Sequence, residues 1–152
     1  MDQDELRDRL NPPTLDETRA RVDAAHQAGD DDLGEATSKD EEVYTFPFEH
    51  KTRRGKVYRG RITTRILSIQ EQEKVGQQLA LMRLGSPIES FDIRTQDIQR
   101  ARVHLAHSLV DPPDWARSEA LAKVPDYDML AALYTEVLSH ERWFLFREVY
   151  PA

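Results

Sequence analysis

Apolar and polar residues alternate along residues 43 to 66, and this period of two is typical of β-strands with one buried face. A glycine-containing loop at residues 51 to 55 separates two such runs, so the pattern predicts a β-hairpin. Pro47 has no amide hydrogen, which places the first strand at a sheet edge or marks a bulge. The inner face is predicted to consist of Tyr44, Phe46, Phe48, Tyr58, Ile62 and Ile66, and the outer face to carry Arg59, Arg61 and Arg65.

Beyond residue 66 the apolar spacing changes to three and four residues, which indicates helices. Ser68 and Glu71 form a capping-box pattern that begins the first helix, and a glycine at position 85 ends it near Leu84. Gly76 lies inside this helix, where glycine costs about 1 kcal/mol relative to alanine, so we expect close packing there. Further helices are predicted from Thr95 to about residue 109, over residues 114 to 123, and from residue 126 or 128 to about residue 149.

The last predicted helix has two apolar sides. At about 100° per residue, its broad stripe suits the domain core and consists of Leu130, Leu133, Tyr134, Val137, Leu138, Phe144 and Leu145. Trp143, Phe146 and Tyr150 lie on the opposite side, so a monomer would leave three rings partly in water. Either the chain end or the hairpin covers these rings, or they form a docking face for another subunit, since aromatic residues are enriched in contact cores.

Charge is divided unevenly along the chain. Residues 1 to 42 hold 14 Asp and Glu against 5 Lys and Arg, whereas residues 43 to 152 hold 14 against 16. Residues 1 to 42 are therefore predicted to be an acidic, largely disordered arm, in which Thr14, Glu17 and Gly29 indicate one helix. This arm either stays solvated, becomes ordered on a neighbouring subunit, or folds back on the basic residues 51 to 65. Residues 43 to 152 are predicted to form a single α+β domain, a two-stranded β-hairpin packed on a bundle of three to four helices.

Composition limits the class of protein. The 152 residues, of which 39% are apolar, suffice for one compact domain. The chain has no cysteine, which excludes disulfides, thiol catalysis and cysteine-ligated metal centres. No apolar run approaches the ~20 residues of a membrane span, and the acidic N-terminus differs from a basic secretory signal. We therefore expect a soluble protein that is made and kept in a cytosol, without a membrane partner.

Candidate catalytic and metal-binding residues are few. His104 and His107 are three residues apart and could share one helix face, but the nearby Arg100 would repel a cation. His140 and Glu141 form half of a zinc-protease motif, whose second histidine is replaced by phenylalanine at position 144. The carboxylates at positions 126 and 128 lie at a predicted helix start, where capping explains them. Since the chain also has no glycine-rich phosphate loop and no nucleophile elbow, we predict no enzyme activity, no cofactor and no metal.

The arginine face of the predicted hairpin has two interpretations. Arg59, Arg61 and Arg65 could contact phosphates, so a nucleic-acid-binding module is the alternative function. However, the aromatic residues of the hairpin are predicted to point inward, and the whole chain has a net charge of −7. These features favour an acidic protein surface over a nucleic acid as the partner.

Several short motifs follow one another in a defined order. They are the aromatic strand at residues 44 to 48, Gly55, Tyr58 and Gly60 before residues 62 to 69, Val75 with Gly76, residues 105 to 110, residues 113 to 115, Glu136 with Val137, and His140 with Glu141. In this order of motifs the segment from Tyr44 to Phe144 resembles a group of small tailed-bacteriophage proteins, the tail assembly chaperones and minor tail or virion proteins. The resemblance covers about two thirds of the chain and leaves the acidic arm without a counterpart.

This resemblance implies a non-enzymatic protein of bacteriophage tail or virion assembly that acts through protein–protein contacts and self-association. Such proteins either coat the tape-measure protein while the tail tube assembles or remain as structural parts of the particle. The implied partners are other tail or virion proteins, and the implied location is the host cytoplasm during assembly or the virion. Combined with the surfaces above, the predicted partner-binding residues are Arg59, Arg61, Arg65, Trp143, Phe146 and Tyr150.

Overall fold

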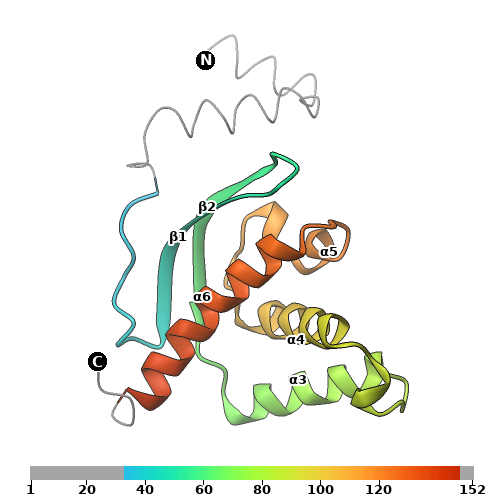
Figure 1. Cartoon of the computed structure of the whole chain (residues 1–152). Coiled ribbons are helices and arrows are strands. Elements are labelled where there is room, and N and C mark those ends of the chain that lie inside the picture. The colour runs from blue at the N-terminus through green and yellow to red at the C-terminus, as the bar shows by residue number, and fades with distance from the viewer. Residues whose placement is uncertain (1–32, 148–152) are drawn as a thin grey trace, which may run out of the picture. The chain divides into compact units, whose positions relative to one another are not determined.

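The computed structural model describes residues 33 to 147. Residues 1 to 32 of the predicted arm therefore lie outside the described residues, and so does Tyr150. The described elements are β1 (Val43–Lys51), β2 (Val57–Arg65), α3 (Ile69–Met82), α4 (Ile93–Ser108), α5 (Ser118–Leu121) and α6 (Tyr127–Phe146), with short 3₁₀ helices at Ile88–Ser90 and Asp114–Ala116 (Figure 1). A two-stranded antiparallel hairpin followed by helices confirms the predicted α+β class.

The hairpin pairs β1 with β2 in the alternating pattern that the sequence predicts. Phe46 lies opposite Ile62, and both are buried on the inner face together with Tyr58. The loop closes through a hydrogen bond from Gly55 N to Thr52 O (2.9 Å). Glycine suits this position because its φ angle is +84°, which side chains with a Cβ rarely adopt.

Both edges of the hairpin are bonded to other parts of the chain at the residue pair Thr45 and Thr63. On the β1 edge, Thr37 N donates to Thr45 O (2.8 Å) and Thr45 N donates to Thr37 Oγ1 (2.9 Å). On the β2 edge, Val110 N donates to Thr63 O (2.9 Å). Pro47, two residues after Thr45, has no amide hydrogen to offer. A two-stranded sheet leaves the outward backbone groups of both strands unpaired. At the centre of this hairpin, Thr45 and Thr63 bond to other parts of the chain, and Pro47 has no amide hydrogen that needs a partner.

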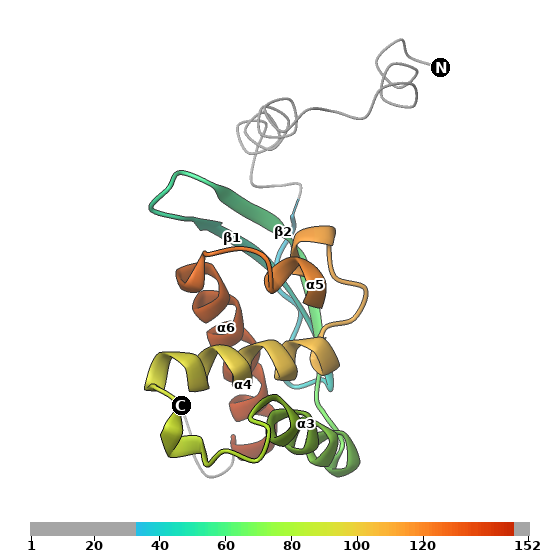
Figure 2. The same cartoon turned by 90° about the vertical axis from the view of Figure 1, so that its right-hand side faces the viewer.

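The core lies between the inner face of the hairpin and helices α4 and α6. Figures 1 and 2 show α6 packed across the hairpin, with α4 next to α6 and α3 next to α4. Met129 and Leu133 of α6 and Leu105 of α4 are almost completely buried, and each contributes about 1.5–3 kcal/mol of hydrophobic stabilisation. Trp115 completes the core near the hairpin tip, where its ring stacks on Phe48 at a centroid distance of 5.6 Å.

Local capping residues determine where the helices begin. Ser68 and Glu71 form the predicted capping box at the start of α3. Helix α4 begins at Ile93 and not at Thr95, because Asp92 is the N-cap and accepts a hydrogen bond from Thr95 N at 2.6 Å. The helix predicted over residues 114 to 123 is divided into a 3₁₀ turn and α5, because the residue between them, at position 117, has an extended backbone.

Two predictions about packing are wrong. Gly76 does not mark close packing, because no described atom lies within 4 Å of a Cβ placed at that position. Leu145, which the sequence places in the core stripe of α6, is 43% exposed, whereas His140 is 1% exposed. The buried stripe of α6 therefore continues from Leu133 through Val137 to His140, and these residues are spaced by four and three positions, as on one face of a helix.

Candidate interaction surface

Residues 35 to 42, which the sequence assigns to the acidic arm, are held against the domain, and we call them the N-terminal strap. The compact unit begins at Glu35 and not at Val43. Lys39 Nζ donates to Ser139 Oγ of α6 (2.8 Å), and His140 Nε2 donates to the carbonyl oxygen of residue 41 (2.7 Å). These contacts differ from the prediction because acidic composition describes average solvation, whereas individual hydrogen bonds fix this short segment.

Asp40 of the strap binds the C-terminal end of α6. Its Oδ1 accepts hydrogen bonds from Trp143 Nε1 (2.9 Å) and from the Arg147 guanidinium (2.6 Å). These two donors hold the pKa of Asp40 below its usual value. All three side chains are exposed, so solvent screens the interaction and it adds little to stability. The arrangement nevertheless shows that this end of α6 accommodates a carboxylate.

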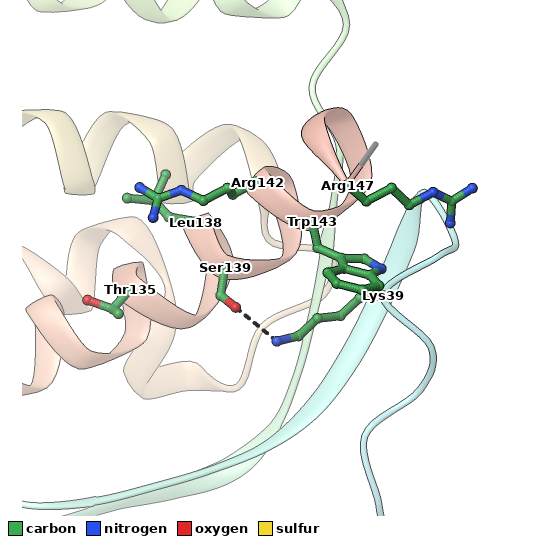
Figure 3. A pocket seen from close by; sticks show the side chains of 7 residues that line it. All are labelled: Lys39, Thr135, Leu138, Ser139, Arg142, Trp143 and Arg147. Carbon is green, nitrogen blue, oxygen red and sulfur yellow. Dashed lines mark hydrogen bonds between the residues drawn. The ribbon is translucent and has the colours of Figure 1, made fainter. Parts of the chain in front are cut away.

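An open groove of about 540 Å³ follows α6 beside the strap (Figure 3). We call it the α6 groove, and its lining consists of Lys39, Thr135, Leu138, Ser139, Arg142, Trp143 and Arg147. Of these described residues, three are cationic and none is acidic. Figure 3 shows Lys39 reaching past Trp143 to Ser139, while the guanidinium groups of Arg142 and Arg147 point in opposite directions. The groove therefore combines apolar surface with a cationic rim.

A second groove, of about 430 Å³, lies between α4 and α6. It shares Thr135 and Leu138 with the α6 groove and continues to Tyr127 at the start of the helix. Arg100 of α4 lines its other side. The solvent-facing side of α6 is therefore hollowed along most of its length, which suits an elongated occupant.

The predicted aromatic surface of α6 is partly in solvent. Trp143 is 37% exposed and Phe146 is 47% exposed. The expectation that a monomer leaves these rings partly in water is confirmed for the two residues that the structure describes. Tyr150, the third predicted member, lies outside the described residues.

Arg65, one of the three predicted outer arginines, joins the hairpin to two helices. It forms an ion pair with Glu71 of α3 and donates a hydrogen bond to His107 O of α4 (3.0 Å). The Arg65 guanidinium, together with the backbone at Ser68, lowers the pKa of Glu71 to about 2. Arg65 is therefore committed to contacts within the domain.

The other two arginines of the predicted face differ from each other. Arg59 lies 3.5 Å from a Glu49 carboxylate oxygen, and its side chain is only 8% exposed. Arg61 is exposed, and it donates to the carbonyl oxygen of Glu35 in the strap (3.2 Å). The three arginines alternate with the buried residues Tyr58, Ile62 and Thr64, as the outer-face prediction requires. Carboxylates within the domain bind two of them, Arg59 and Arg65.

A cluster that the sequence did not predict connects the hairpin tip to the start of α6, and we call it the hairpin-tip cluster. The buried Asp126 accepts two hydrogen bonds from Arg54 (3.1 and 2.8 Å) and one from the Tyr58 hydroxyl. Arg54 and then Tyr58 hold the pKa of Asp126 below its usual value, while burial and Asp126 raise the pKa of Tyr58. His50 Nε2 lies 3.0 Å from Asp128. The sequence predicts that Asp126 caps α6, but its side chain makes no capping hydrogen bond.

The two histidines of α4, His104 and His107, contact different helices. His104 Nε2 lies 3.3 Å from a Glu141 carboxylate oxygen of α6, whereas His107 Nε2 lies 3.0 Å from Gln78 Oε1 of α3. Within residues 33 to 147, no group of three or more metal-binding side chains is arranged to hold an ion. A helix with the length and apolarity for crossing a membrane is likewise not found in that range.

The chain was compared with protein families, curated proteins and solved structures. No family model, no curated protein and no solved structure matches the chain.

Helix α3 presents an apolar surface that sequence reasoning missed. In the described structure none of its 14 residues is buried. Large exposed side chains lie at its ends, in the connection to α4 and at the first residue of α4, and they are Ile69, Leu81, Leu84 and Ile93. A groove of about 320 Å³ between α3 and α4 is partly lined by Leu81, Met82 and Val103. Glutamines separate the apolar residues of α3 in sequence, so they form no wide stripe that would have indicated a contact surface.

Proposed function

We propose that this protein is a non-enzymatic bacteriophage tail or virion assembly protein that acts through contacts with other tail or virion proteins and through self-association. The observation that carries this proposal is the exposed apolar end of α6, where Trp143, Leu145 and Phe146 are all partly in solvent. Burial of such side chains against a partner is favourable, and aromatic residues dominate the energetics of many interfaces. The order of motifs between Tyr44 and Phe144 supplies the class of partner.

The exposed residues of α3 support the same function. Leu81 and Ile69 are more than two thirds exposed on a helix that packs against α4. Together with the end of α6, α3 gives the domain a second apolar surface. Two surfaces suit a subunit that contacts more than one neighbour, either as a chaperone on the tape-measure protein in the host cytoplasm or as a resident part of the virion.

Nucleic-acid binding, the alternative function, has less support. Glu49 and Glu71 already bind Arg59 and Arg65, so contacts with phosphates would first require these ion pairs to be broken. Residues 33 to 147 also hold 17 Asp and Glu against 17 Lys and Arg, which gives the described part of the chain no excess of positive charge.

The test uses the full chain and the purified tail-tube, tape-measure and capsid proteins encoded near it. Phe146→Ala is the test variant, and Val43→Ala is its control, because Val43 is an exposed apolar residue on the hairpin. We expect binding to at least one of these proteins, weakened about tenfold by Phe146→Ala and unchanged by Val43→Ala. The proposal fails when the full chain binds none of them. Mass spectrometry of purified particles then separates a resident component from a chaperone.

A further inference from the structure

The α6 groove has the chemistry of a site for an acidic segment. Lys39, Arg142 and Arg147 surround it, and Leu138 together with the ring of Trp143 gives it an apolar surface (Figure 3). A segment with carboxylates along one side and small apolar side chains along another matches both features. The lining of the groove therefore favours an occupant with negative charge and apolar surface.

One carboxylate already lies at an end of this groove. Asp40 accepts hydrogen bonds from Trp143 Nε1 and from Arg147. Arg142 is exposed and points in the other direction along α6 (Figure 3). Guanidinium groups bind carboxylates in a bidentate manner, so Arg142 suits a second acidic side chain.

The most acidic segment available is the part of this chain that precedes the strap. Residues 1 to 32 hold 10 Asp and Glu against 4 Lys and Arg, whereas charges balance in residues 33 to 147. The helix that the sequence predicts from Thr14, Glu17 and Gly29 falls in this segment, outside the described residues, and Leu15 and Val22 give the segment apolar side chains.

The start of the strap lies at the outer face of the hairpin. The carbonyl oxygen of Glu35 is bonded to Arg61, which lies on the outer face of the hairpin. Helix α6, with its groove, packs on the side of the hairpin that carries the buried Phe46 and Ile62. The chain therefore enters the domain on the side of the hairpin away from α6.

We propose that residues 1 to 32 of one copy bind the α6 groove of a second copy, so that self-association occurs by exchange of acidic arms. This inference rests on the proposed function, of which it specifies the self-association. Arm exchange supplies the partner for the cationic rim and covers the exposed side of α6. It also makes association sensitive to salt, because the contact joins opposite charges near solvent.

The experiment measures self-association of the purified full chain by sedimentation velocity over a range of concentrations. Arg142→Glu reverses the charge at the groove, and Arg53→Glu makes the same change at an exposed position of the hairpin loop as a control. A synthetic peptide of residues 1 to 32 is added in excess as a competitor, with a scrambled peptide of the same composition beside it. We expect Arg142→Glu to weaken association by about tenfold or more and the peptide to produce monomers, whereas Arg53→Glu and the scrambled peptide have no such effect.

Several outcomes would overturn arm exchange. They are a full chain that stays monomeric at every concentration, association that Arg142→Glu leaves intact, and equal displacement by the scrambled peptide. A monomer that fails to bind the added peptide also contradicts exchange. None of these measurements involves a tail protein, and binding to tail proteins is tested through Phe146, which does not line the groove. A chain that binds tail proteins but does not exchange arms would leave the proposed contacts with tail proteins intact.

Discussion

Replacing Asp126 with alanine should lower the free energy of unfolding by about 2–3 kcal/mol, mainly through its effect on Tyr58. Tyr58 is 1% exposed, and its hydroxyl donates to Asp126. Without the carboxylate this hydroxyl is buried and has lost its acceptor, which costs about 1–3 kcal/mol, and a hydrogen bond to a charged group contributes about 1.5–3 kcal/mol. The ion pair with Arg54 adds much less, because the Arg54 side chain is 55% exposed and solvent screens it.

A double-mutant cycle separates these two partners of Asp126. Urea unfolding of Asp126→Ala, Tyr58→Phe, Arg54→Ala and the two double variants, followed by tryptophan fluorescence, gives a coupling energy for each pair. We expect the coupling between Asp126 and Tyr58 to be about 1.5–3 kcal/mol and to exceed the coupling between Asp126 and Arg54. A larger coupling to Arg54, or a loss below about 0.5 kcal/mol in Asp126→Ala, would refute the reasoning.

The same carboxyl makes stability depend on pH. The pKa of Asp126 in the folded protein is below the 3.8 of an ordinary aspartate, so its contribution is complete above pH 3.8. The contribution is then lost as the pH falls through the folded pKa, where protonation removes the charged acceptor. Urea unfolding of the wild type and of Asp126→Ala in this acidic range should therefore converge as the pH decreases.

Three further predictions use the same urea assay. Gly76→Ala should raise the free energy of unfolding by about 0.5–1 kcal/mol, because helix propensity improves and the new methyl group meets no described atom within 4 Å; a loss of stability would contradict this. Leu133→Ala should cost about 2–5 kcal/mol, whereas Leu81→Ala at an exposed position should change stability by less than about 0.5 kcal/mol, and similar losses at both sites would be inconsistent with the described core. Burial and then Glu136 raise the pKa of Tyr44 to about 12, so stability should fall as the pH rises from 10 towards 12, and a Tyr44→Phe variant with the same alkaline loss would exclude Tyr44 as its source.

The hairpin and the start of α3 could be predicted because their signals are local. Alternation around Phe46 and Ile62 gives the buried face directly, since neighbouring residues of a strand point to opposite sides. Ser68 and Glu71 lie three residues apart, and that spacing alone places both side chains at the start of α3. Such patterns need no knowledge of the remaining fold.

The candidate surface could be predicted only in part, because its geometry depends on contacts between distant positions. The exposure of Trp143 and Phe146 follows from helical periodicity alone. In contrast, Asp40 reaches Trp143 across 103 positions of sequence, and Tyr58 reaches Asp126 across 68. Composition cannot show which carboxylate meets which donor. For the same reason the sequence assigned the strap to a solvated arm.

The closed edges of the hairpin limit how another chain can bind this domain. Because Thr37 and Val110 occupy the central backbone groups of both strands, a neighbour cannot extend the sheet by adding a strand of its own there. Another chain must then recognise this part of the domain through side chains. The same closure removes the template that unpaired strand edges offer for aggregation at these positions.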